Sequence, residues 1–120
     1  MPSIGAIIAI AMTAITIDSY ILDVLMADLV GHDHKPSAYL VYLAIWSAGQ
    51  AKAVAISHAE LAERTGLSKR TVQSAVAHLV RRQLLQSLSA GPTEISRYQP
   101  LMPWRRGAGA VPVGTEDDST

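Results

Sequence analysis

Apolar residues recur at helical spacing through the middle of the chain. After Pro36, the residues that share this spacing are Tyr39, Leu40, Tyr42, Leu43 and Trp46. Proline has a fixed φ that suits the start of a helix, and glycine commonly follows the end of one. The segment from Pro36 to Gly49 is therefore predicted to be a helix, with Tyr39, Tyr42 and Trp46 packed in the core.

A short helix is predicted next by a capping signal. Ser57 and Glu60 have the S-x-x-E spacing of a capping box, in which each side chain accepts a hydrogen bond from the backbone N–H of the other residue. This helix is expected to run from His58 to about Arg64. Gly66 then permits the positive φ that a tight turn between two helices requires.

A second, longer helix is predicted from about Lys69 to Arg82. Ser68 precedes it and offers a side-chain oxygen to the free backbone amides of its first turn. The residues that recur at helical spacing, and so are expected to face the core, are Val72, Ala75, Val76 and Leu79. The opposite side carries cationic and hydrogen-bonding side chains and no acid.

Three short segments have the pattern of β-strands. Residues 84–88 and 95–99 are strand-like, and residues 89–94 between them contain the Gly and Pro of a hairpin tip. Residues 53–56 are apolar and too short for a helix of their own, which favours an edge strand.

The beginning of the chain is apolar. Residues 4–17 fit both the spacing of a helix and the alternation of a strand, so the pattern does not decide between them. The stretch is shorter than the roughly 20 residues that span a bilayer. No Lys or Arg precedes it, as one would in a secretory signal. We therefore expect neither a membrane span nor a targeting segment.

A further helix is predicted from Ser19 to Leu29, with Asp18 as its N-cap and Gly31 as its stop. The apolar stripe along it consists of Ile21, Leu22, Leu25, Met26 and Leu29. Because the N-terminal segment is large and apolar for a chain of this size, it is expected either to extend the core or to form a dimer interface.

The composition argues against several kinds of site. There is no cysteine, which excludes disulfides, thiolate metal ligands and a cysteine nucleophile, and fits a reducing compartment such as the cytoplasm. No nucleophile with a base, no carboxylate pair and no phosphate-binding loop stands out, so we expect no enzymatic activity and no cofactor. His32, Asp33 and His34 are adjacent, but no further ligand is spaced to join them, so we expect no metal site.

The formal net charge is zero, but the charges are unevenly distributed. All ten Lys and Arg lie within residues 35–106, against three glutamates. Residues 1–34 contain four aspartates, residues 107–120 contain three acids, and neither region has a Lys or Arg. The middle of the chain is therefore the part suited to a polyanion.

The segment ISHAELAERTGLSKRTVQSAVAHLVRRQLL resembles the helix-turn-helix of bacterial winged-helix regulators and of plasmid and phage replication initiators. The resemblance extends over about residues 35–100. The family's small residue falls on Ala62, its turn glycine on Gly66, and its serine cap with a basic first turn on Ser68, Lys69 and Arg70. Gln83 departs from the pattern, because similar proteins often have a glycine there that ends the second helix.

The resemblance implies a mostly α-helical fold, a winged helix-turn-helix with a three-helix core and a small β-hairpin wing, preceded by an N-terminal helix. It implies double-stranded DNA as the partner, bound by a cytoplasmic homodimer. We accordingly expect an N-terminal segment at residues 1–34, a DNA-binding domain at residues 35–106 and a disordered acidic tail at residues 107–120.

The residues expected to contact DNA lie on the exposed side of the second helix and at nearby cations. Lys69 and Arg70 are expected at guanine edges or phosphates, and Arg82 is a further candidate for a flanking phosphate. The full set is Arg64, Ser68, Lys69, Arg70, Thr71, Gln73, Ser74, Arg81 and Arg97.

Three functions agree with the sequence. A transcriptional regulator is the first interpretation, and a plasmid or phage replication initiator shares the same motif. The third is a winged helix that contacts proteins and does not bind DNA, since a fold does not fix a function.

Overall fold

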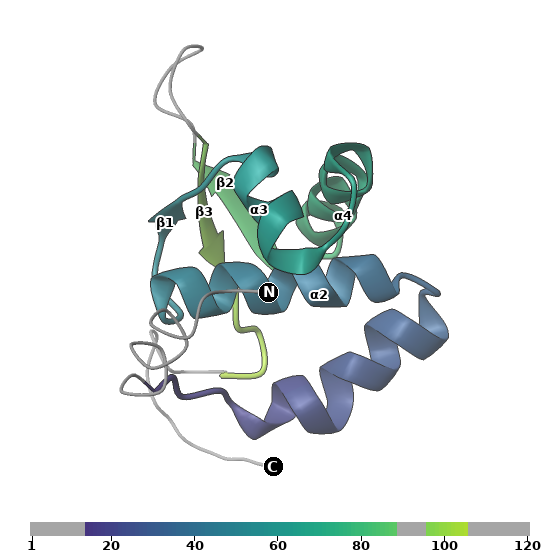
Figure 1. Ribbon diagram of the computed structural model, residues 1–120. Helices are drawn as coiled ribbons and strands as arrows, with labels where there is room; N and C mark the ends of the chain where they lie inside the picture. The colour runs from purple at the N-terminus through teal and green to yellow at the C-terminus, as the bar shows by residue number, and fades with distance from the viewer. Residues whose placement is uncertain (1–13, 89–95, 106–120) are drawn as a thin grey trace.

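The computed structural model describes residues 14–88 and 96–105 (Figure 1). Over these ranges the chain forms an N-terminal helix, three further helices and a three-stranded antiparallel sheet. The fold is mostly helical, as predicted, and has the layout of a winged helix. The predicted hairpin tip, the predicted acidic tail and most of the ambiguous segment 4–17 lie outside the described residues; residues 14–17 belong to no helix or strand.

Helix α2 (Pro36–Gly49) is the centre of the core and lies between the N-terminal helix and the other two helices (Figure 1). Pro36 stands at its start, as predicted, and Gln50 ends it in the left-handed region with a φ of 51°. Gly49 allows a close approach of the next strand, because a Cβ at this position would lie 3.0 Å from the Cβ of Val54. The buried side chains of α2 are Ala38, Tyr39, Val41, Tyr42, Ile45 and Trp46.

The three ring residues predicted for the core are buried there, and each satisfies its polar atom on a backbone carbonyl from a distant segment. The bonds run from Tyr39 to Ile21 (2.9 Å), from Tyr42 to Leu101 (3.0 Å) and from Trp46 to Thr16 (2.9 Å). Amphipathic rings can be buried at low cost when the polar tip finds a partner. These bonds tie both flanking segments of the domain to α2.

The sheet has the strand order β1 (Val54–Ala55), β3 (Arg97–Pro100), β2 (Leu85–Leu88). All three strands were predicted to within two residues, and β1 is an edge strand as expected. The central strand pairs on both sides through Tyr98, which lies opposite Val54 in β1 and Ser87 in β2.

The N-terminal helix begins at Ser19 and continues to His32, mostly with i→i+5 hydrogen bonds, as η1 (Ile21–Leu25) and η2 (Ala27–His32). Ile21, Leu25 and Leu29 are buried in the same core as α2. The prediction that Leu22 and Met26 would join this stripe is wrong, because their side chains are 50% and 40% exposed. The buried side chains of this helix are spaced four residues apart, and Leu22 and Met26 follow two of them directly and point away from the core.

Both ends of this helix also differ from the prediction. Asp18 makes no side-chain cap, because its carboxylate accepts hydrogen bonds from Trp104 and Arg105 instead. Gly31 lies inside η2, and the left-handed residue that redirects the chain toward α2 is His34, with a φ of 56°. None of the helices in the described part of the chain is long and apolar enough to cross a membrane.

Candidate nucleic-acid interface

Helix α3 (His58–Thr65) begins with the predicted capping box. The Ser57 hydroxyl accepts from the backbone N–H of Glu60 at 3.0 Å, and the Glu60 carboxylate accepts from the backbone N–H of Ser57 at 3.0 Å. Gly66 follows in the left-handed region with a φ of 79°. The capping box and the glycine turn that leads into the next helix are therefore both present as predicted.

Helix α4 (Lys69–Arg81) begins at Ser68, whose hydroxyl accepts from the backbone N–H of Thr71 at 3.0 Å. The same hydroxyl donates to the Thr71 hydroxyl at 2.8 Å. Two of the residues predicted to contact DNA are therefore already joined to each other in the free protein. These two hydrogen bonds hold the first turn of α4 at its N-cap.

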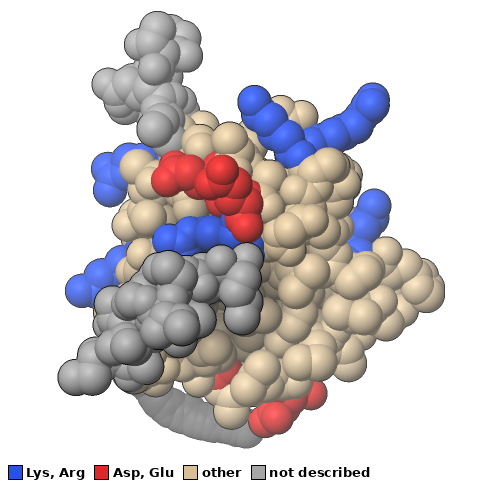
Figure 2. All heavy atoms as spheres, viewed as in Figure 1, with Lys and Arg blue, Asp and Glu red and all other residues tan. Residues whose placement is uncertain are grey.

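The two sides of α4 differ as predicted. Val72, Ala75, Val76 and Leu79 are buried, and α4 packs on both α2 and α3. The predicted DNA-contacting residues that lie exposed on its other side are Lys69, Arg70, Gln73, Ser74 and Arg81. Figure 2 shows lysine and arginine side chains that project at the upper and right edges around α4, whereas acidic side chains gather over α3 and near the N-terminal helix.

The remaining two predicted cations are exposed on other elements. Arg64 stands in the last turn of α3 and borders a shallow hollow between α2 and α3, where Leu40 and Thr65 are among its neighbours. Arg97 lies on β3, the central strand of the sheet. The structure thus brings seven of the nine predicted residues to α4 and its cap, and places these two cations apart from them.

Arg82 is not available to a phosphate, so this part of the prediction is wrong. Its guanidinium binds Asp28 through Nη2 at 2.6 Å and also binds Asp33, and Asp33 accepts a further bond from His78 Nε2 at 2.8 Å. Burial by itself raises the pKa of Asp33, but the hydrogen bonds from His78, His32 and Arg82 outweigh it and lower the pKa to about 2. We call Asp28, Asp33, His78 and Arg82 the aspartate clasp; it joins the N-terminal helix to the end of α4.

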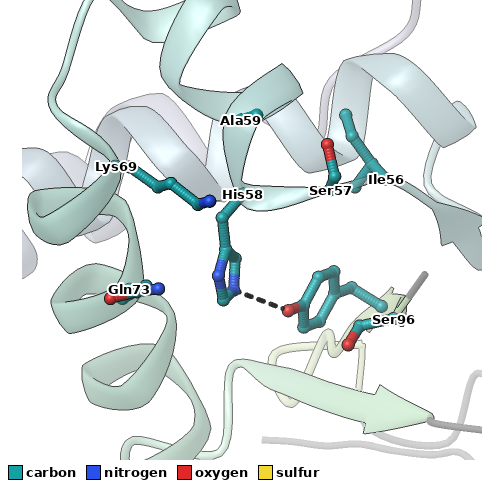
Figure 3. Close-up of a pocket in the computed structure, with 8 residues that line it drawn as sticks. Ile56, Ser57, His58, Ala59, Lys69, Gln73 and Ser96 are labelled. Atoms are coloured by element: carbon teal, nitrogen blue, oxygen red, sulfur yellow. Dashed lines mark hydrogen bonds between the residues drawn. The ribbon is translucent and has the colours of Figure 1, made fainter. Parts of the chain in front are cut away.

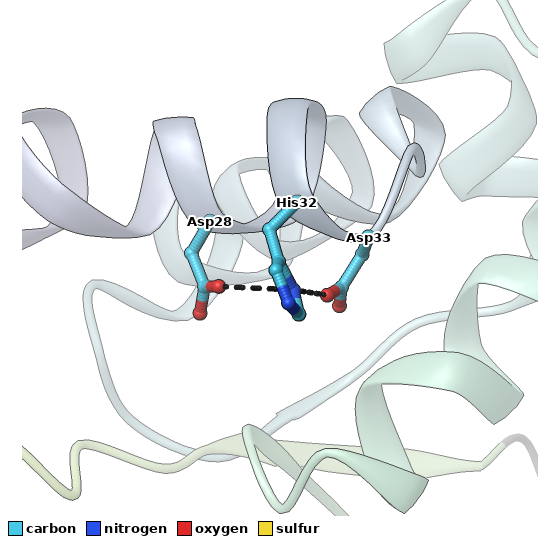
Figure 4. Close-up of side chains that lie close together, drawn as sticks. All are labelled: Asp28, His32 and Asp33. Carbon is cyan, nitrogen blue, oxygen red and sulfur yellow. Dashed lines mark hydrogen bonds and ion pairs between the residues drawn. The ribbon is translucent and has the colours of Figure 1, made fainter.

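Asp28 and Asp33 also flank His32, and one ligand atom of each of the three residues lies within 4.8 Å of the others (Figure 4). This set differs from the adjacent residues considered in the sequence, since Asp28 takes the place of His34. Both carboxylates already bind the Arg82 guanidinium, which supplies the positive charge that a cation would otherwise bring. The arrangement is therefore explained by the aspartate clasp.

A hollow of about 320 Å³ lies beside the first turns of α4, between this helix, the start of α3 and β3. Figure 3 shows His58 in its middle, with Lys69 and Gln73 of α4 on one side, and Tyr98 of β3 also lines the hollow. His58 Nε2 lies 3.0 Å from the Tyr98 hydroxyl. Burial, reinforced by the charge of Lys69, lowers the pKa of His58.

The comparison with protein families agrees with this geometry. Residues 35–85 match the family model of a helix-turn-helix domain. This segment has the fold of a helix-turn-helix domain. No curated protein and no solved structure is significantly similar to the chain. A helix-turn-helix domain suggests DNA binding.

The matched segment of the helix-turn-helix domain runs from Lys35 to the first residue of β2, so it includes α2, β1, α3 and α4. The N-terminal helix, the rest of β2 and the central strand β3 lie outside the matched residues. Tyr98, which lies on β3, was not predicted to belong to a site, because the residues around a tyrosine in a strand give no sign of a polar partner 40 positions away.

The end of α4 in the helix-turn-helix domain explains the departure at Gln83. Gln83 has a φ of 59°, so it occupies the left-handed position where similar proteins have glycine. Its N–H bonds to the carbonyl of Val80, and the N–H of Leu84 bonds to that of Leu79 at 2.9 Å. This is the Schellman arrangement, completed by the buried pair Leu79 and Leu84. The helix stops at the expected place without the glycine.

Proposed function

We propose that the protein binds duplex DNA in a sequence-specific manner through its helix-turn-helix domain and acts as a transcriptional regulator in the cytoplasm. One observation supports this most directly. Within the described residues, Arg82 and Arg105 are each bound by aspartates, whereas Lys69, Arg70 and Arg81 have no acidic partner. The cations left without an internal partner on α4 are therefore those on its exposed face.

In the proposed complex, α4 lies in the major groove with its first turn toward the bases, the usual docking of a recognition helix. Lys69 and Arg70 then reach guanine edges or nearby phosphates, since both cations can donate to the acceptors of guanine. Gln73 and Ser74, one turn further, supply polar contacts to base edges. Arg64, Arg81 and Arg97 contact phosphates and add affinity without sequence information.

The sequence-specific part of the proposal is tested by selecting bound duplexes from a random library and competing the selected duplex against random DNA. We expect the selected duplex to bind about a thousandfold more tightly or better. Substituting Gln73→Ala should relax the preference at one or two base pairs, because a side chain that reads a base edge carries discrimination of about 1 to 3 kcal/mol. Equal affinity for selected and random duplexes would contradict sequence-specific binding.

A homodimer is the second part of the proposal, and the exposed face of the N-terminal helix supports it. Leu22, Val24, Met26 and Val30 are 50%, 43%, 40% and 38% exposed on this helix. Exposed apolar residues concentrated on one element are typical of a surface that contacts another protein. A two-fold dimer through this face would present two copies of α4 to successive half-sites.

The dimer is tested by sedimentation of the wild type and of a Leu22→Gln, Met26→Gln variant. Both side chains are already exposed, so the monomer should fold normally while the dimer dissociates. A wild type that sediments as a monomer at every concentration would contradict the dimer. A protein that fails to bind DNA but captures a partner through the same face would favour the protein-contact function instead, and replication of a plasmid carrying the selected site would favour an initiator.

A further inference from the structure

The hollow around His58 is polar and lies on the DNA-facing side of the domain. Its polar lining comes from three elements that converge on one point: the start of α3, the first turns of α4 and β3. The side chains concerned are Ser57, His58, Lys69, Gln73, Ser96 and Tyr98. Among residues 14–88 and 96–105, those that line it include no carboxylate, and their formal charge at neutral pH comes from Lys69. Such a hollow suits an anion that accepts several hydrogen bonds.

The position of the hollow identifies the anion. Lys69 and Gln73 belong to the exposed face of α4 that the proposed function places in the major groove. The two sugar-phosphate backbones border that groove, so the space between α4 and the sheet is where one of them passes. A phosphodiester group that enters there meets Lys69 on one side and the His58 and Tyr98 pair on the other (Figure 3).

The charges around His58 make its protonation depend on the anion. Lys69 faces it from α4 and disfavours a second positive charge, and Tyr98 faces it from β3 with a neutral hydroxyl. On its own helix, the Glu60 carboxylate is turned toward the backbone N–H and hydroxyl of Ser57. Ile56, which precedes the N-cap Ser57 and also lines the hollow, is apolar. A phosphate between Lys69 and His58 would balance the lysine charge and favour the imidazolium.

We infer that this hollow holds one backbone phosphate of the bound DNA and that His58 takes up a proton from solvent as the phosphate enters. The inference rests on the proposed function and adds that His58 both contacts a DNA phosphate and makes the binding depend on pH. DNA affinity is then greatest at acid pH and falls as the pH rises through the range between the free and the bound pKa of His58. The fall reaches up to about tenfold in Kd for each pH unit by which the phosphate raises that pKa.

The test is the Kd for a fluorescent random duplex at constant salt, measured between about pH 5.5 and 8, where histidine titrates. We expect the affinity of the wild type to fall by about 3- to 10-fold over this range, and that of His58→Gln to be nearly constant. His32→Gln is the matched control, because His32 is a largely exposed histidine on the N-terminal helix, and it should retain the wild-type dependence. The same pH dependence in His58→Gln and in the wild type would overturn the inference while leaving DNA binding intact. A wild type that binds no DNA at any pH would instead contradict the proposed function.

A second measurement does not depend on a variant that folds. The imidazole resonances of His58 can be followed by NMR through a pH titration of the free protein and of its DNA complex. We expect the pKa of His58 to be higher in the complex. An unchanged or lower pKa in the complex would overturn the inference.

Discussion

The aspartate clasp should contribute measurably to stability, and Asp33→Asn is the substitution that tests it. The Asp33 side chain is 7% exposed. It accepts hydrogen bonds from His78, which lies in α4, and from Arg82, the residue that follows α4. Asparagine keeps the size of the side chain but removes the charge that these donors neutralise. The variant therefore leaves the Arg82 guanidinium with only the more exposed Asp28 as a partner.

The size of the effect follows from the pKa of Asp33, which the clasp lowers from the ordinary value of 3.8 to about 2. Such a difference corresponds to about 2 kcal/mol of stability, and the partial exposure of Arg82 keeps the effect below the 3 to 5 kcal/mol of a fully buried pair. Because the pKa is lower in the folded protein, this contribution is complete above about pH 4 and is lost as the pH falls toward 2.

The assay is urea denaturation of the wild type and the variant at several pH values. We expect Asp33→Asn to lower the free energy of unfolding by about 2 kcal/mol above pH 5, and the difference to shrink below pH 4. Asp23→Asn is the control, since Asp23 is exposed on the same helix and has no ion-pair partner among the described residues; it should change stability by less than about 0.5 kcal/mol. Equal stabilities of the two variants would refute the reasoning.

Substitutions at three further positions test the ends of α3 and α4, each by thermal or urea denaturation. Gln83→Gly should stabilise the protein by about 0.5 to 1 kcal/mol, because glycine relieves the left-handed backbone at a smaller entropic cost; a loss of stability would mean that the Gln83 side chain has a role of its own. Gly66→Ala should cost about 1 kcal/mol through its φ of 79° alone, since nothing lies within 4 Å of the added Cβ, and an unchanged midpoint would contradict the turn geometry. Ser57→Ala should cost about 1 kcal/mol by removing half of the capping box, and Ser57→Asp should restore most of it; no restoration would show that the cap is not what matters at this position.

The helices and strands were predictable where the signals are local. The capping box at Ser57, the turn at Gly66 and the cap at Ser68 each act within three or four residues, so the sequence contains everything needed to place α3 and α4. The burial of α4 followed from its apolar spacing for the same reason. The Schellman end of α4 at Gln83 was harder to predict. Its hydrogen bonds form here without the glycine that usually marks such a helix end.

The parts that could not be predicted depend on contacts between distant residues. Arg82 is adjacent to an exposed arginine and has the same local pattern, yet it binds Asp28, which lies 54 positions away. Asp18 has the local pattern of an N-cap, yet it accepts from residues 86 and 87 positions further along. Which arginines are neutralised by aspartates and which remain available to DNA is therefore a property of the fold.

The location of the N-terminal helix shows the same limit. Its apolar residues identified a helix, but which of them face α2 depends on where α2 lies and on the wider turns of η1 and η2. The outward side chains Leu22 and Met26 were for this reason assigned to the core. Their exposure is what now supports a surface for a second copy of the chain.

The central claim, that the exposed face of α4 binds duplex DNA, is tested most directly by fluorescence anisotropy with a random duplex across a salt series. The comparison is between the wild type, a Lys69→Ala, Arg70→Ala variant, and Lys52→Ala, which removes an exposed cation outside the proposed interface. We expect affinity that falls steeply with salt, a slope of log Kobs against log salt that is reduced by about two in the double variant, and no change in Lys52→Ala, with all three proteins equally stable. Absence of binding at low salt, or equal slopes for the double variant and the wild type, would contradict the claim.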